Sequence, residues 1–190
     1  MCHVAKKRLR KTNWGSGKCM LQQVELDLDM KEPFFAMVHD FRLAGETRYS
    51  EVLEDDFNFV SYIVTLRNES SGKNLCEGHV PMTTLWLIND RNEICGLSRL
   101  RHYLTPGLEK EGGHIGYVVP PSKRKKGHGT VLLGLMLGRA REFGLDRVLV
   151  TCDSDNIGSA RIIEKNGGVF ENEVVSDNSG KLVSRYWIKL

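Results

Sequence analysis

The stretch "HIGYVVPPSKRKKGHGT", residues 114–130, decides the fold of this chain. Its first six residues read as a β-strand, and the apolar run over residues 130–144 has the composition of a helix. Between strand and helix lie four basic residues, 123–126, and then Gly127 and Gly129. The first N–H groups of a helix lack intrahelical partners and carry partial positive charge, and glycine lets a ligand approach the backbone closely. The stretch therefore predicts a phosphate-binding loop at a strand-to-helix junction.

Two common phosphate-binding motifs do not match this stretch. No Gly-Lys pair in the sequence is followed by Ser or Thr, as a P-loop requires. Leu132 occupies the third glycine position of a dinucleotide-binding fingerprint. A solvated basic loop, a nuclear-type address or a nucleic-acid patch would account for the basic residues, but not for two glycines at the start of a helix. The glycines are therefore the specific part of the stretch.

Two motifs within residues 114–168 resemble those of a known family. The first is Arg-x-x-Gly-x-Gly, formed by Arg124, Gly127 and Gly129. The second lies in the next expected helix and consists of Asn156, Ser159, Glu164, Lys165 and Gly167. In this order they resemble the core of the GNAT superfamily of N-acetyltransferases and, within it, a bacterial group of predicted acetyltransferases. The resemblance implies acetyl-CoA as co-substrate and no metal.

The resemblance also implies which residues hold acetyl-CoA. Backbone amides of residues 125–130 would bind the pyrophosphate, with charge added by Arg124 and Lys126. The strand before the loop would diverge from its neighbour and offer the pantetheine arm its edge, including one N–H for the thioester oxygen. Asn156 would contact the pantetheine arm or the adenine side of the cofactor, or serve as a plain helix N-cap, and both can be true. The complete predicted cofactor-binding set is Val118, Val119, Arg124, Lys125, Lys126, Gly127, His128, Gly129, Thr130, Asn156 and Ser159.

Amine acetylation needs a group that removes a proton, because an alkyl amine with a pKa of about 10.4 is mostly protonated at pH 7. The family often places a glutamate on the strand before the cofactor loop, and His114 occupies that place here. Glu109 and Glu111, in the loop just before it, are rival bases. His114 and Glu111 are therefore the predicted bases. The alternative for His114 is a polar strand residue without a catalytic role.

Two departures from the family pattern concern the leaving group. Ile163 stands where many members have a proton-donating tyrosine, and Gly168 replaces an aromatic residue. Tyr117, another tyrosine or water is then the expected proton donor for the thiolate. Cys152, at the end of an expected buried strand, is predicted to be inert rather than an acyl-accepting nucleophile.

Hydrophobic patterns along the chain predict strands at residues 20–30, 83–90, 94–104, 114–119, 146–153, 169–175 and 182–190. Helices are expected at residues 34–45, 55–67, 130–144 and 156–168. Residues 105–113 are expected to form a loop. This order gives an α/β (α+β) fold. The GNAT resemblance implies a mixed, mostly antiparallel central sheet that is flanked by helices and splayed at the cofactor strand.

The N-terminal segment differs from the rest of the chain in charge. The first 20 residues hold six basic residues and no acidic one, whereas the remainder carries 21 basic and 24 acidic residues. We therefore expect a basic, flexible tail over residues 1–19 and a single domain over residues 20–190. Such a tail can contact nucleic acid or an acidic partner, although nucleic-acid binding is the least favoured function.

Composition argues against several other classes of protein. No apolar segment approaches the roughly 18 residues of a membrane span, and the sequence lacks a signal-peptide pattern. The five cysteines are scattered and form no CxxC pair. Their spacing disfavours a disulfide framework or a zinc site and favours a reducing, cytoplasmic location.

The sequence therefore predicts an enzyme that moves the acetyl group of acetyl-CoA to an amine by direct attack on the thioester. The alternative is a non-catalytic acetyl-CoA-binding or sensor domain on the same fold. The acceptor would be a small molecule or a protein amine, and a homodimer is a further expectation from the superfamily. A cationic acceptor is a hypothesis that rests on a cluster of acids, Glu46, Glu51, Glu54, Asp55 and Asp56.

Overall fold

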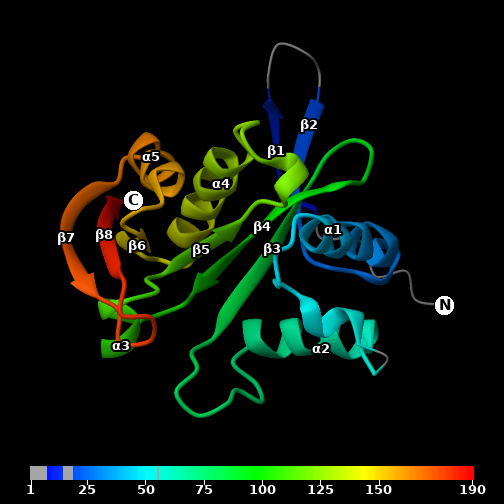
Figure 1. Ribbon diagram of the computed structural model, residues 1–190, viewed down its shortest axis with the longest axis horizontal. Helices are drawn as coiled ribbons and strands as arrows, with labels where there is room; N and C mark the ends of the chain where they lie inside the picture. The colour runs from blue at the N-terminus through cyan, green and yellow to red at the C-terminus, as the bar shows by residue number, and fades with distance from the viewer. Residues whose placement is uncertain (1–7, 15–18, 55) are drawn as a thin grey trace.

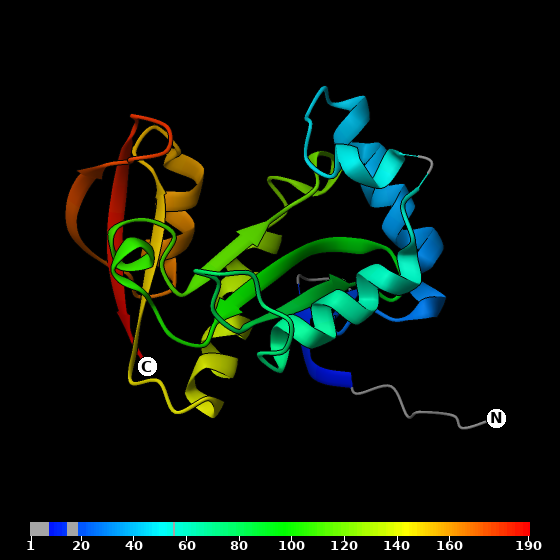
Figure 2. The same cartoon turned by 90° about the horizontal axis from the view of Figure 1, so that it is seen from below.

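The computed structural model describes residues 8–14, 19–54 and 56–190, which form two sheets (Figures 1 and 2). The first sheet has five strands in the order β1 (Arg8–Trp14), β2 (Cys19–Val24), β3 (Met82–Ile88), β4 (Ile94–Arg101) and β5 (Ile115–Val118). The second has three strands in the order β6 (Arg147–Asp153), β8 (Leu182–Lys189) and β7 (Val169–Val175). Neighbouring strands within each sheet are antiparallel.

Helices cover both faces of the first sheet. The α-helices are α1 (Lys31–Leu43), α2 (Phe59–Ser70), α3 (Pro106–Lys110), α4 (His128–Glu142) and α5 (Ile157–Lys165), and the 3₁₀ segments are η1 (Leu28–Met30), η2 (Ser50–Leu53) and η3 (Pro121–Lys123). On one face α1 and α2 pack through a cluster around Phe34 and Trp86. On the other face α4 packs through Leu132, Leu133 and Met136. Within the described ranges, none of these helices is long and apolar enough to cross a membrane.

The predicted α/β class, with a mostly antiparallel sheet flanked by helices, is confirmed. Helix α1 shows how local sequence produces it. Its apolar residues recur at helical spacing and are buried together, and they are Phe34, Met37, Val38 and Phe41. The central strands β3 and β4 are buried on both faces along most of their length, as expected for strands with helices on either side.

The N-terminal region differs from the expectation in two places. Residues 8–14, expected within a flexible tail, form β1, which pairs with β2; residues 1–7 and 15–18 lie outside the described residues. The first expected strand ends at Val24 instead of continuing to residue 30. The reason is Asp27, whose carboxylate accepts a hydrogen bond from the Leu28 N–H at 2.7 Å and starts η1.

Two helix starts also differ from the expectation. Helix α3 lies inside the expected loop at residues 105–113. It begins where the Thr105 hydroxyl accepts a hydrogen bond from the Leu108 N–H, with proline in its first turn. Helix α2 begins at residue 59 rather than 55, because the Asn58 side chain caps it by accepting from the Ser61 N–H at 3.0 Å. In both cases a capping side chain sets the boundary.

The two sheets meet between the start of β5 and the middle of β6. Within the described residues a single backbone–backbone hydrogen bond joins them, from His114 N to Leu149 O at 2.7 Å. Beyond this point β5 and β6 continue without ladder bonds to each other, and α4 and α5 lie beside the resulting gap (Figure 1). The predicted splay at the cofactor strand is therefore present.

Candidate active site

A groove of about 690 Å³ lies at this gap, beside β5 and the start of α4. Ten of the eleven predicted cofactor-binding residues line it, namely Val118, Val119, Arg124, Lys125, Gly127, His128, Gly129, Thr130, Asn156 and Ser159. Lys126 does not line the groove, and its Nζ donates to Ser122 O at 2.8 Å. Two motifs that are separate in the sequence thus form one cavity.

The start of α4 builds one end of the groove. Gly127 is its N-cap residue, with a φ of 79°, a left-handed conformation that glycine adopts without strain. The Nδ1 atom of His128 lies 2.9 Å from the carbonyl oxygen of Lys123 and closes the turn. Val131 is the first residue of the helix whose N–H bonds back, to Gly127 O at 3.2 Å. The N–H groups of residues 128–130 therefore precede the intrahelical ladder, which is the arrangement that binds anions.

Gly129 has a different physical role from Gly127. A Cβ atom at position 129 would lie 2.6 Å from Cδ1 of Ile162 in α5. Gly129 has an ordinary helical conformation, so glycine is not needed there for a positive φ. It is needed because α4 and α5 approach each other closely at this residue. That approach forms the narrow wall of the groove beside the helix start.

The basic run is tied to other parts of the chain. Arg124 forms a bidentate pair with Glu46, from Nη1 to Oε1 at 2.6 Å and from Nη2 to Oε2 at 2.9 Å, and its Nε donates to Val119 O. Hydrogen bonding from Arg124 lowers the pKa of Glu46. Lys123 pairs with Glu93 at 2.8 Å. We expected Arg124 to add charge toward the pyrophosphate, but in the structure it links the cofactor loop to the loop after α1.

Three other basic side chains line the groove and were missed by the sequence analysis. Arg161 and Lys165 come from α5, and Arg48 comes from the loop after α1. Residues 161 and 165 are one helical turn apart, so their common face is readable from the sequence once α5 is placed. The position of Arg48 could not be predicted from the sequence in this way. It lies in the loop after α1, which the ion pair between Glu46 and Arg124 links to the cofactor loop. Positive charge therefore comes from both walls of the groove.

Glutamine at either end of the Arg124–Glu46 pair is expected to weaken coenzyme A binding by about threefold, because exposed ion pairs contribute roughly 0.2–1 kcal/mol. Arg124→Gln, Glu46→Gln and the double variant should lose equal affinity in calorimetric titrations, since each breaks the same link. Tighter binding by Glu46→Gln, or additive losses in the double variant, would show instead that Arg124 binds phosphate directly.

Tyr117 is the predicted catalytic residue that lies in the groove. Its hydroxyl oxygen is 2.7 Å from Oγ of Ser159. Burial raises the pKa of Tyr117 to about 12, and the bond to Ser159 offsets this only in part. The Asn156 side chain holds Ser159 from the other side by accepting its N–H at 3.0 Å. Asn156 is therefore a helix N-cap and a groove residue at once, and Tyr117 carries its proton at neutral pH.

The edge of β5 that faces away from β4 is open toward the gap. Arg101 N donates to His114 O at 2.8 Å, and the antiparallel register then turns the N–H of Val118 toward β4 as well. By the alternation of such a ladder, the N–H groups of Tyr117 and Val119 turn toward the gap. An N–H for the thioester oxygen is therefore available from Tyr117 or Val119, rather than from Val118.

The three predicted catalytic residues are not brought together. His114 is buried between the sheets, and its Nδ1 accepts a hydrogen bond from the Leu149 N–H at 2.9 Å. In a neutral imidazole the accepting nitrogen is the only one that can take a proton, so this site is occupied. Glu111 is hydrogen-bonded to Asn178 and lines a separate cavity of about 410 Å³. Of the three, only Tyr117 lines the groove.

Cys152 lies at the end of β6, and burial raises the pKa of its thiol. The thiolate is the nucleophilic form of cysteine, so this environment disfavours an acyl-cysteine intermediate. Across the part of the chain that the structure describes, no group of three or more His, Cys, Asp or Glu side chains is placed to hold a metal ion.

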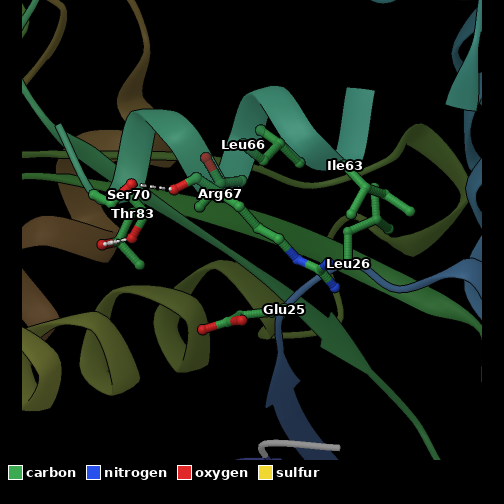
Figure 3. A pocket seen from close by; sticks show the side chains of 9 residues that line it. Glu25, Leu26, Ile63, Leu66, Arg67, Ser70 and Thr83 are labelled. Carbon is green, nitrogen blue, oxygen red and sulfur yellow. Dashed lines mark hydrogen bonds between the residues drawn. The ribbon is translucent and has the colours of Figure 1, made fainter. Parts of the chain in front are cut away.

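A smaller pocket of about 200 Å³ lies between α2 and the part of β3 that extends past the end of β2 (Figure 3). Arg67 and Glu25 line it, and Ser70 Oγ is 2.9 Å from Thr83 Oγ1 at one end. None of the predicted site residues lines this pocket. The candidate active site is therefore the groove beside β5 and not this pocket.

A splayed sheet, a glycine-opened helix and a groove with basic walls are the features that the sequence resemblance predicts for a coenzyme A-dependent acyltransferase. The model of the acetyltransferase (GNAT) domain matches residues 32–169, and the chain belongs to this family. Acetyl-CoA is accordingly the acetyl donor. No curated protein matches the chain by sequence.

Solved structures share the fold at low sequence identity. The microcin C7 self-immunity acetyltransferase, solved with acetyl-CoA and AMP, is 13% identical and has a TM-score of 0.66, with 90% of this chain and 92% of that chain covered. An acetyltransferase from Salmonella typhimurium that modifies the N-terminal serine of ribosomal protein L7/L12 is 15% identical, with a TM-score of 0.62 and coverage of 90% and 95%. A ribosomal L7/L12 α-N-protein acetyltransferase in complex with coenzyme A is 16% identical, with a TM-score of 0.59 and coverage of 90% and 94%.

Proposed function

We propose that the protein transfers the acetyl group of acetyl-CoA to an amine of a small molecule or a protein. The observation that carries this proposal is the gap between β5 and β6 beside the first turn of α4. The N–H groups of residues 128–130 would take the pyrophosphate, and the pantetheine arm would lie along the open edge of β5. The thioester would then lie near Tyr117.

The proposed reaction is a direct attack of the neutral amine on the thioester carbonyl carbon. A C–N bond forms, and the carbonyl oxygen becomes an oxyanion that accepts a hydrogen bond from the N–H of Tyr117 or Val119. The C–S bond then breaks, the nitrogen releases its extra proton to water, and the thiolate takes a proton from the Tyr117 hydroxyl, which solvent restores. The position of Tyr117 in the groove supports this role, whereas its raised pKa makes the hydroxyl a weaker acid and limits its contribution.

Tyr117→Phe is expected to lower kcat by about tenfold with little change in the KM for acetyl-CoA. Phenylalanine fills the same space but has no proton to give. The effect stays below the 10²–10⁴-fold range of general acids, because a thiol with a pKa of about 8.5 is a tolerable leaving group. Steady-state kinetics measure both constants, with Tyr103→Phe at an exposed tyrosine as control. An unchanged kcat in Tyr117→Phe would assign the proton transfer to water.

The proposed activity is tested by the release of free coenzyme A thiol from acetyl-CoA in the presence of amines. The panel includes polyamines, free amino acids and peptides with a free N-terminus. We expect release that depends on one class of amine and that is lost in a variant unable to bind coenzyme A. Binding of acetyl-CoA with no turnover on any amine would point instead to a binding or sensor domain.

The acidic residues between α1 and α2 support a cationic acceptor, though fewer of them are available than the sequence suggests. Glu46 is held by Arg124, and Asp55 lies outside the described residues. The other acids of residues 51–56 are the ones that would attract a cationic amine. Equal turnover of neutral and polycationic amines would reject this part of the proposal. The free thiols of Cys76 and Cys152 agree with a reducing, cytoplasmic location.

A further inference from the structure

The side chain of His114 takes part in the junction between the two sheets. Leu149, in the middle of β6, directs both of its backbone groups at His114. Its C=O accepts from the His114 N–H at 2.7 Å, and its N–H donates to the His114 Nδ1 at 2.9 Å. In a regular parallel pair, the Leu149 N–H would bond to the backbone carbonyl of Gly112, two residues before His114. The imidazole thus stands where a backbone carbonyl would normally stand.

The Gly112 carbonyl is turned away and bonded elsewhere. Nη1 of Arg101 donates to Gly112 O at 2.9 Å and to Gly113 O at 2.8 Å, and the Gly112 N–H donates to Oγ1 of Thr151 at 3.1 Å. Both glycines have a positive φ, 102° and 58°. The chain therefore leaves the ladder before β5 begins, and His114 makes the two hydrogen bonds to the backbone of β6, beside the bond from Gly112 to the Thr151 side chain.

The bond to Leu149 defines the state of the His114 ring. A ring nitrogen that accepts a hydrogen bond is unprotonated, so the ring is neutral with its proton on Nε2. Burial is the main cause that lowers the pKa of His114, with Arg101 and Arg147 acting in the same direction and Glu109 against them. The Trp187 ring packs 6.3 Å from the imidazole. Burial and the two arginines, on β4 and β6, therefore favour the neutral, accepting form against the opposing charge of Glu109 on α3.

We propose that His114 is a positioning residue whose neutral imidazole replaces a backbone carbonyl, ends the ladder between the sheets and thereby sets the gap that receives the thioester. This inference rests on the proposed function, because the gap matters only if it receives acetyl-CoA. It excludes His114 as the base, since the nitrogen that would take the amine proton already accepts the Leu149 N–H. A protonated ring cannot accept that bond, so the junction weakens in acid.

Two variants separate this role from catalysis. In His114→Asn the side-chain oxygen takes the place of Nδ1 and can accept the Leu149 N–H, but the amide neither titrates nor acts as a base. In His114→Leu the acceptor is lost while the apolar volume is retained. We expect the Asn variant to stay within about threefold of the wild type in coenzyme A affinity and kcat. The Leu variant should lose about tenfold in affinity, because it leaves a buried N–H without a partner.

The dependence on pH adds a second readout. The folded-state pKa of His114 lies below its ordinary value of 6.5, so the unfolded chain takes up the proton first as the pH falls. The hydrogen bond from the Leu149 N–H to His114 contributes its full stability above about pH 6.5. This contribution is lost as the pH falls through the pKa of His114 in the folded protein. Thermal midpoints and coenzyme A affinity should therefore fall more between about pH 7.5 and pH 5.5 in the wild type than in His114→Asn.

Three outcomes would overturn the proposal. One is full coenzyme A affinity in both variants with turnover lost in both, which would make His114 a base. Another is a Leu variant equal to the wild type in affinity and thermal midpoint, which would leave the bond without effect. The third is faster hydrogen exchange of the Leu149 amide in the Asn variant than in the wild type. If the wild type binds no coenzyme A, the proposed function fails, but the thermal midpoints and the exchange of the Leu149 amide still test the junction.

Discussion

Gly129→Glu is expected to lower coenzyme A affinity by more than about 100-fold. The new carboxylate would stand in the first turn of α4, where the pyrophosphate is proposed to bind. Two unit charges about 4 Å apart near a protein surface repel by roughly 4 kcal/mol, which corresponds to almost three orders of magnitude in affinity. The side chain would also press on Ile162, since even a Cβ atom lies 2.6 Å from its Cδ1. Calorimetric titration with coenzyme A measures the loss.

Gly129→Lys is the matched control, because it adds the same contact with Ile162 but the opposite charge. We expect it to lose no more than about tenfold in affinity, since the ammonium group offsets part of the steric cost. Thermal midpoints of the two variants should be similar, which separates folding from binding. Equal losses of affinity in the Glu and Lys variants would show that Gly129 serves only the packing of α4 against α5, and that no anion binds there.

Gly113→Ala is expected to reduce the free energy of unfolding by about 3 kcal/mol. Gly113 has a φ of 58°, and a Cβ atom would lie 2.5 Å from the backbone oxygen of Leu149, the acceptor of the His114 N–H. Relief of this contact requires movement of β6 itself, because the obstacle is backbone rather than a flexible side chain. Urea denaturation with a two-state fit measures the change.

Gly144→Ala separates the two causes of that loss. Gly144, just after α4, also has a positive φ, 82°, but a Cβ atom there has nothing within 4 Å. It should cost only the backbone penalty, about 1 kcal/mol. The excess at Gly113 then reports on the junction between the sheets. If both variants lose the same amount, the backbone at residue 113 moves easily, and the junction does not fix the spacing of β5 and β6.

The cofactor end of the groove was predictable from the sequence because its chemistry is local. Arg124, Gly127 and Gly129 lie in one loop, and the strand before them and the helix after them are readable from apolar patterns. The second motif could be placed in the same way, because Asn156 is a capping residue at a helix start. The spacing of these residues within one loop was enough to predict an anion-binding site.

The contacts of Arg124 and His114 were not predictable, because each depends on a partner far away in the sequence. Glu46 is 78 residues from Arg124, and Leu149 is 35 residues from His114. A basic residue in a phosphate motif is expected to bind phosphate, and only the structure shows that a carboxylate forms an ion pair with it. Likewise, a histidine at a base position is a candidate base until its nitrogen is seen to accept a backbone N–H. Only tertiary structure brings these partners together.

The limits of the predicted elements have a similar explanation. Long periodic segments such as α1 and α4 were found within a few residues. Helix α3 was missed because its five residues are too few to show a period, although Thr105 and Pro106 form a helix-start signal. The strand β1 was missed because the charge of residues 1–20 outweighed their pattern, and its pairing with β2 depends on a second strand.

The Arg124–Glu46 pair has a consequence for protein engineering. The segment between α1 and α2 holds the acids that we propose attract the acceptor, so it is a segment to graft in tests of acceptor preference. A graft that lacks a carboxylate at residue 46 would release the guanidinium of Arg124 at the rim of the groove and alter how the donor is held. Chimeras of this fold therefore need to exchange residues 46 and 124 together, so that donor affinity and acceptor preference are inherited as one unit.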